Sequence, residues 1–299
     1  MNYLHHDVFT RTIRISGNIK TISRIHIGSG DVEATFEETD SPLIRVTIDG
    51  TNLPYIPGSS LKGVFRSTVE AILKSVNEYA CLLKRKGPCF QNAKLILEAS
   101  KMKKYDAIKK AVENYCFACK IFGGPGYFSN IFISDCIPSS SSTISFDVSP
   151  GIAINRRSGT TMPGALFTFE HINPNSLFNF QFQVKNLPNY LIGLIFYVIF
   201  LINKGVVLIG GKKRAGLGII EIIIDSIEIL TSEGKKCINL KEINSLNLKE
   251  YQIEKITNND FDINLDIESL LNKSAEEFSE NIINKFRNVW DLYVKNKEN

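Results

Sequence analysis

The sequence lacks an apolar run long enough to cross a bilayer. Its strongest run, LIGLIFYVIFLI at residues 191–202, has twelve residues, whereas a membrane-spanning helix needs about 20. We therefore expect a buried core helix there. The N-terminus, MNYLHHDVF, also lacks the basic region and apolar run of a secretory signal. These absences lead us to expect a soluble, cytoplasmic protein with no membrane partner.

Charge of either sign is not in large excess, since the net charge is +4. Its distribution is uneven: residues 231–299 hold 10 Lys and Arg against 13 Asp and Glu, which leaves 25 against 18 for residues 1–230. The basic part favours a polyanion such as nucleic acid as partner, though only weakly. A chain of 299 residues, 43% of them hydrophobic, can form the core of one large domain or two.

The most informative stretch, residues 24–68, contains IHIG, TDSPLI and IPGSSLKGVFRST. Pro57 and Gly58 end an extended segment, because proline lacks an N–H and glycine tolerates positive φ. Ser59 or Ser60 can then cap a helix. A capped N-terminus suits phosphate, and its candidate contacts are Gly58, Ser59, Ser60, Lys62 and Arg66. An ordinary amphipathic helix with solvated charges fits the same pattern.

Four further motifs follow in order along the chain: CFAC at 116–119 with IFG after it, DVSPGIAINRRSG, GALFTFEHI, and GGKKRAGLG at 210–218. Together with the stretch at 24–68, they resemble the RAMP superfamily of CRISPR proteins, most closely the backbone subunit of type III effector complexes. The resemblance covers residues 10–226. It implies guide RNA, target RNA, copies or paralogues of the chain in a filament, and other type III effector subunits as partners.

The order of predicted elements, strand–helix–strand and then strand–helix–strand, fits an α+β, ferredoxin-like (RRM-like) fold. We expect an RNA-binding domain at 1–230 and a mainly helical extension at 231–299, which docks on a neighbouring subunit or on its own domain. The domain would carry a basic, zinc-binding insertion at 78–120 and a thumb-like loop at 147–163. The alternating phenylalanines of 177–184 are expected in the core rather than stacked on bases.

Three local elements are also expected: a turn at 49–50, a central strand at 206–209 and a helix at 267–271.

The polar loop after IHIG holds several carboxylates, most of which we expect to be solvated. Asp40 differs because Ser41-Pro42 fixes the chain beyond it, and because the resemblance places the catalytic aspartate at this TDSP position. Asp31 is the competing candidate. The implied activity is cleavage of target RNA at regular intervals with Mg²⁺ or Mn²⁺, in which a carboxylate holds the ion beside the scissile phosphate as the 2′-hydroxyl attacks.

Three alternatives remain open at this point. The chain could be a paralogue that organises RNA without cutting it. It could be a metal-independent, guide-processing RAMP endonuclease, which would have to use His26, one of only four histidines; the resemblance otherwise places His26 in contact with the guide RNA. It could also be a zinc protein with no RNA function.

Four cysteines bracket the insertion. Cys116 and Cys119 form a CxxC chelate turn, and Cys81 and Cys89 form a second pair with seven residues between them. Four thiolates can complete a tetrahedral zinc site, and free thiols are the alternative. The basic insertion lacks the apolar residues for a core of its own and would gain from a metal clip. The resemblance also implies zinc at this place.

Two further segments are expected to touch RNA. In 147–163, which we expect as a polar loop of little periodicity, Arg156 and Arg157 suit phosphates and Met162 could act as a wedge between bases. The resemblance implies that this segment forms a projecting, thumb-like hairpin that kinks the guide–target duplex and exposes the backbone beside Asp40. In the glycine-rich loop, glycines allow close approach to a phosphate; the candidate contacts are Gly211, Lys212, Lys213 and Arg214.

Overall fold

The structure, a computed structural model, describes residues 9–28, 39–82, 87–101, 111–140, 144–231, 234–239, 255–256, 262–265, 270 and 273–298.

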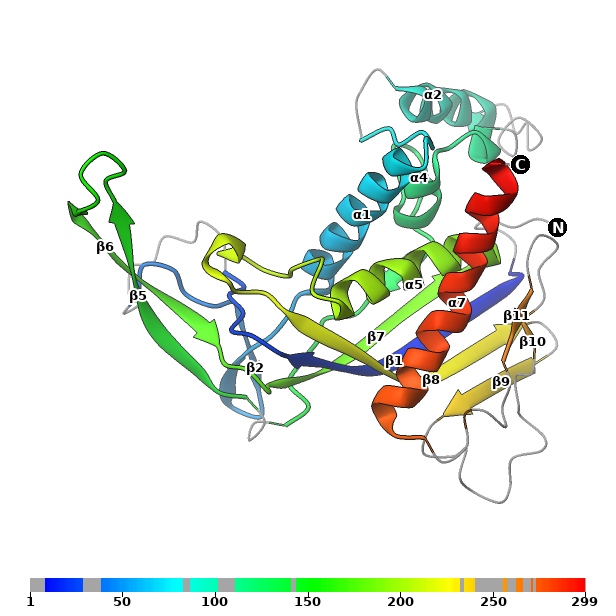
Figure 1. Cartoon of the computed structure of the whole chain (residues 1–299). Coiled ribbons are helices and arrows are strands. Elements are labelled where there is room, and N and C mark those ends of the chain that lie inside the picture. Colours follow the sequence, from blue (N-terminus) through cyan, green and yellow to red (C-terminus); the bar gives the residue numbers. More distant parts are fainter. Residues whose placement is uncertain are drawn as a thin grey trace.

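A five-stranded antiparallel sheet forms the centre of the fold (Figure 1). Its strand order is β4 (Ile131–Ile133), β7 (Leu177–Lys185), β1 (Arg11–Thr21), β8 (Ile220–Thr231) and β9 (Gly234–Asn239). Two helices, α1 (Gly58–Ser75) and α5 (Asn189–Asn203), make the connections β1–α1–β4 and β7–α5–β8. The chain therefore follows the predicted β–α–β–β–α–β order of a ferredoxin-like unit.

The sheet buries one face. In β1 every second residue is buried, as strand geometry requires when one face meets the core. In β7 the alternate residues Phe178, Phe180 and Phe182 are at most 1% exposed, while Asn179 and Gln181 between them are exposed. The phenylalanines therefore pack in the core, as predicted.

The C-terminal helix α7 (Ala275–Glu298) packs against α5 and β8. The rings of Phe196 and Phe286 stack with centroids 4.2 Å apart, and Trp290 is 2% exposed. Of the two alternatives for this region, the structure thus shows packing onto its own chain. Two short strands, β10 (Lys255–Ile256) and β11 (Ile263–Asn264), pair beside it. The helix predicted at 267–271 lies outside the described residues except for Leu270.

Helix α5 is the apolar run expected as a buried helix, and most of its side chains are buried. In the part of the chain that the structure describes, no helix is both long and apolar enough to span a bilayer.

One predicted strand is absent. Residues 206–209, expected as a central strand, form irregular structure instead. The amides of Val206 and Val207 both donate to the carbonyl oxygen of Leu201, at 3.0 and 3.3 Å. These two amides therefore satisfy a carbonyl oxygen at the C-terminal end of α5 and cannot donate to a neighbouring strand. The hairpin of β2 (Arg45–Ile48) and β3 (Thr51–Pro54), by contrast, turns at 49–50 as predicted.

A second hairpin, β5 (Phe146–Ile154) and β6 (Thr161–Ile172), projects from the body of the molecule (Figure 1). From the residue pattern alone we expected a polar loop at 147–163, but most of this segment is paired strand. The family resemblance, by contrast, implied a thumb-like hairpin at this place. Much of both faces of β5 is exposed, so the strand carries little of the apolar–polar alternation that marks a half-buried strand. Pro150 and Gly151 within it also resemble turn residues.

Close packing of α5 on α7 generates the first prediction. A Cβ at Gly193 would lie 2.8 Å from the Phe286 carbonyl oxygen and 2.9 Å from the Trp290 amide nitrogen. We expect Gly193→Ala to lower the free energy of unfolding of the full chain by about 1–3 kcal/mol, because the helices must separate. At Gly63 in α1 nothing lies within 4 Å, so Gly63→Ala should raise it by about 0.5–1 kcal/mol. Urea denaturation followed by circular dichroism measures both; equal effects would contradict the packing.

Candidate functional site

Asp40 lies against strand β6. Its Oδ2 accepts hydrogen bonds from the backbone N–H of Thr168 at 2.6 Å and from the Thr168 hydroxyl at 3.2 Å. The Asp40 N–H lies 3.3 Å from the same hydroxyl oxygen, to which it donates. Among the described residues, no hydrogen bond reaches Oδ1. The Thr168 amide and hydroxyl lower the pKa of Asp40, so this exposed side chain is an ionised carboxylate with one open oxygen at neutral pH.

The segment that follows Asp40 continues along β6. Ser41 forms a parallel bridge with Phe169, and its carbonyl oxygen accepts the Glu170 N–H at 3.1 Å. Glu170 accepts the Leu43 N–H at 2.8 Å and pairs with Arg45 at 2.9 Å. Burial acts to raise the pKa of Glu170, but the Arg45 and Leu43 hydrogen bonds lower it overall. Glu170 is therefore an anchor for residues 40–45, with both carboxylate oxygens occupied.

His26 joins the IHIG segment to β6 and to the glycine-rich loop. Its Nδ1–H donates to the Glu170 carbonyl oxygen at 2.7 Å, and its own carbonyl oxygen accepts the Gly211 N–H at 2.7 Å. The side chain is 7% exposed, and a Cβ at Gly28 would lie 3.1 Å from its Nε2. The structure thus gives His26 a positional role, and its direct contact with a guide RNA stays a prediction.

A groove of about 410 Å³ lies where IHIG, α1 and the glycine-rich loop meet. It brings together two predicted contact residues, Ser60 and Gly211. Small residues make up most of its lining, which consists of Ile27, Gly28, Ser60, Gly63, Val64, Ser67, Ile209, Gly210 and Gly211. Small side chains leave room for a polymer backbone and let main-chain groups reach it.

Cations flank the same region. The ammonium of Lys212 lies 4.5 Å from the ring centroid of Phe167 and 4.8 Å from that of Phe169, which holds it by cation–π attraction. The next two predicted contacts, Lys213 and Arg214, are exposed in the 3-10 turn that follows. The remaining predicted contacts, Arg156, Arg157 and Met162, are exposed near the turn of the β5–β6 hairpin.

The start of α1 differs from the expectation of a capped, phosphate-binding end. Pro57 occupies the N-cap, and no side chain caps the helix, so Ser59 and Ser60 do not serve as caps. The Gly58 N–H donates to Asp135 Oδ1 at 2.8 Å, and a Cβ at Gly58 would lie 2.2 Å from the Ile133 carbonyl oxygen. Asp135, which is distant in the sequence, therefore accepts a hydrogen bond from the amide that we expected to bind phosphate. No local sequence pattern indicates this contact.

Lys62 and Arg66 are not among the residues that line the groove. Arg66 pairs with Glu70 at 2.9 Å, donates to the Gly123 carbonyl oxygen at 2.8 Å, and lies 3.6 Å from Cys119 Sγ. The Lys62 ammonium lies 3.3 Å from the Ile131 carbonyl oxygen; burial and the charge of Arg66 lower its pKa. RNA contacts by these two residues stay predictions. Asp31, the competing catalytic candidate, lies outside the described residues.

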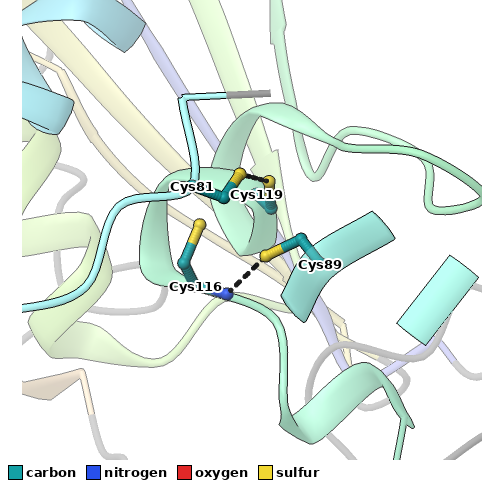
Figure 2. A group of neighbouring side chains, drawn as sticks. All are labelled: Cys81, Cys89, Cys116 and Cys119. Carbon is teal, nitrogen blue, oxygen red and sulfur yellow. Dashed lines mark hydrogen bonds between the residues drawn. The ribbon is translucent and has the colours of Figure 1, made fainter. Parts of the chain in front are cut away.

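The four predicted cysteines meet in one buried cluster, with their sulfur atoms directed toward a common centre (Figure 2). Cys81 follows α1, Cys89 lies in α2 (Pro88–Lys101), and Cys116 and Cys119 lie at the start of and within α4 (Phe117–Phe122). The Sγ atoms all lie within 4.8 Å of one another. A tetrahedral site with Zn–S bonds of about 2.3 Å separates its sulfurs by about 3.8 Å, so the cluster could bind a metal such as zinc.

Protons are shared unevenly within this cluster. Hydrogen bonds with Cys119 and Cys89 lower the pKa of Cys116, and the contacts with Cys116 raise those of Cys89 and Cys119. Four buried thiolates repel one another, and a bound cation offsets that repulsion. The donor set and the geometry therefore both fit a soft divalent ion.

The sequence matches the model of the RAMP superfamily over residues 18–221. This region includes the IHIG segment, Asp40, the cysteine cluster and the glycine-rich loop. The chain therefore belongs to the RAMP superfamily.

Within that superfamily, the chain is similar to three proteins that each bear the name CRISPR system Cms endoribonuclease Csm3. The protein from Streptococcus thermophilus is 42% identical over 60 residues, which cover 20% of this chain and 26% of that protein. The one from Methanothermobacter thermautotrophicus is 37% identical over 81 residues, 27% of this chain and 29% of the relative. The Enterococcus italicus protein is 44% identical over 55 residues, which cover 18% of this chain and 25% of that protein. The alignments thus span between a quarter and a third of each relative.

The contacts of Arg66 generate the second prediction. We expect Arg66→Met to lower the free energy of unfolding by about 2 kcal/mol, because Glu70 and the Gly123 carbonyl lose a charged donor. Lys62→Met, one turn earlier, should change it by less than about 0.5 kcal/mol, since Ser129 still donates to the Ile131 carbonyl oxygen. Chemical denaturation of the full chain measures both. A loss for Arg66→Met below about 0.5 kcal/mol would show that Arg66 is a solvated surface charge.

Proposed function

We propose that this chain is a backbone subunit of a cytoplasmic type III CRISPR ribonucleoprotein. In this proposal it binds guide RNA along a filament of copies or paralogues and cleaves complementary target RNA by metal-dependent endonucleolysis. Membership of the RAMP superfamily and the similarity to proteins named as endoribonucleases support this function. The observation that carries the cleavage step is the exposed, ionised carboxylate of Asp40, held against β6 with Oδ1 open.

The donor set near Asp40 suits a hard divalent cation. Mg²⁺ keeps several waters and is bound by one or two carboxylates together with substrate phosphates. Asp40 would hold the ion through Oδ1, while Glu170 stays committed to Arg45 and Leu43. When bound, Mg²⁺ or Mn²⁺ would neutralise charge on the scissile phosphate.

Cleavage in this proposal is an in-line attack of the target 2′-hydroxyl on the adjacent phosphorus. The bond to the 5′-oxygen breaks, the 2′-hydroxyl loses its proton, and the leaving oxygen gains one, which gives a 2′,3′-cyclic phosphate and a 5′-hydroxyl. In this mechanism the chain positions the target RNA for attack. The hairpin tip, with Arg156, Arg157 and Met162, would distort the duplex, and Asp40 lies beside β6 of the same hairpin.

The guide strand would follow the groove lined by Ser60, Gly211 and their small neighbours. Lys212, fixed on two phenylalanine rings, and the exposed Lys213 and Arg214 would neutralise its phosphates. A guide-processing mechanism through His26 receives no support, because its imidazole is 7% exposed and its Nδ1–H is taken by a carbonyl oxygen.

We further propose that the cysteine cluster holds a structural zinc ion. Its ligands come from three separate segments around α1, α2 and α4. The clip would attach the insertion at 78–120 to α1, and Arg66 beside Cys119 would offset the negative charge of a four-thiolate site.

The third prediction tests cleavage. In the assembled ribonucleoprotein with Mg²⁺ and a labelled target, Asp40→Asn should slow the regularly spaced cuts about 100-fold or more, because the metal loses its charged ligand. Guide-RNA content should not change. Asp49→Asn removes the same charge from an exposed turn where asparagine also accepts positive φ, and it should cut normally. If the Asp40 variant cuts at the natural rate, the chain acts as a scaffold.

The fourth prediction concerns the cysteine cluster. The purified natural chain should contain one zinc ion, measured by inductively coupled plasma mass spectrometry, and chelation should lower its melting temperature because ligand binding stabilises the folded state. Cys89→Ser should lose the ion, whereas Cys237→Ser, whose cysteine lies in β9 outside the cluster, should keep it. Zinc retained in full by Cys89→Ser would contradict the four-cysteine site.

A further inference from the structure

Three hydrogen bonds link Thr168 to Asp40. The threonine amide and hydroxyl both donate to Oδ2, at 2.6 and 3.2 Å, and the Asp40 N–H donates to the threonine oxygen at 3.3 Å. Two donors on one carboxylate oxygen restrict rotation of the side chain, and among the described residues Oδ1 accepts no hydrogen bond. The residue types alone give no sign of this contact, since the two positions lie 128 residues apart.

The strand around Thr168 is well anchored. On one edge of β6, Phe167 and Phe169 pair with Gly151 and Ser149 of β5. On the other edge, the amides of Thr168 and Glu170 face the segment that contains Asp40. The side chains of Phe167 and Phe169 also contact Lys212 of the glycine-rich loop. Thr168 is thus held by contacts on both of its sides and can transmit the position of the hairpin to Asp40.

We propose that Thr168 is a positioning residue for target cleavage: it orients Asp40 so that Oδ1 faces the metal, and it links Asp40 to the hairpin that engages the duplex. This inference rests on the proposed function. Partners that orient a metal-binding carboxylate typically contribute about 10–100-fold to metal affinity or activity. A mutation at Thr168 should therefore change the metal requirement of the reaction more than the stability of the chain.

The test uses the assembled ribonucleoprotein, with single-turnover cleavage measured over a Mg²⁺ titration. Thr168→Val keeps the amide and removes the hydroxyl, and we expect the half-saturating Mg²⁺ concentration to rise roughly tenfold. Thr168→Ser, which keeps a hydroxyl, should have a half-saturating Mg²⁺ concentration close to that of the natural chain. Thr51→Val makes the same change at an exposed site in β3 and should match the natural chain. Melting temperature and guide-RNA content should be the same in all four.

Two results would overturn the inference while leaving the proposed function in place. The first is an unchanged Mg²⁺ dependence in Thr168→Val when Asp40→Asn is inactive under the same conditions. Asp40 would then still be the catalytic group, but Thr168 would not be needed to orient it. A uniform loss of rate at every Mg²⁺ concentration that Thr168→Ser does not repair indicates a merely structural threonine. If Asp40→Asn itself cuts normally, the proposed function fails first and the inference fails with it.

Discussion

Hydrogen bonding along strand β6 is the constraint on which the candidate site depends. One edge of the strand pairs with β5, and the other receives Asp40, Ser41 and Leu43. The Glu170 carbonyl also fixes His26, and the neighbouring phenylalanines fix Lys212. Three segments far apart in the sequence therefore meet on one strand. Because every one of these contacts involves a backbone group or a side chain of β6, a single strand sets the positions of the carboxylate and of the basic loop together.

Glycines make the crossing of these segments possible. At Gly210, with φ of 82°, a Cβ would lie 2.3 Å from the His26 carbonyl oxygen, and at Gly218 one would lie 2.4 Å from the Ile209 carbonyl oxygen. From the sequence, we interpreted the glycines of this loop as allowing close approach to a phosphate. The structure shows that at least these two serve close contact between main chains. The cations between them, Lys212 to Arg214, follow directly after Gly211 of the groove lining.

Features with a local signal in the sequence could be predicted, whereas features that depend on contacts between distant positions could not. The buried strands β1 and β7 and the helix α5 follow from periodicity, and the cysteine spacing led to a cluster that the structure brings together. From the residue pattern alone the β5–β6 hairpin was expected as a loop, because little of β5 is buried; the expectation of a hairpin came only from the family resemblance. The Asp135 contact to α1, the Arg66 contact to Cys119 and the Thr168 contact to Asp40 could not be predicted, since each joins positions separated by more than 50 residues.

The most direct test of the central claim is the structure of the assembled ribonucleoprotein with Mn²⁺ and a target RNA that carries a 2′-deoxy nucleotide at the cleavage site. The account predicts a metal ion bound to Oδ1 of Asp40 at about 2.1 Å and to a non-bridging oxygen of the scissile phosphate. The Thr168 contacts to Oδ2 should persist. A phosphate positioned for cleavage with no metal at Asp40, or with its metal held by other residues, would contradict the account.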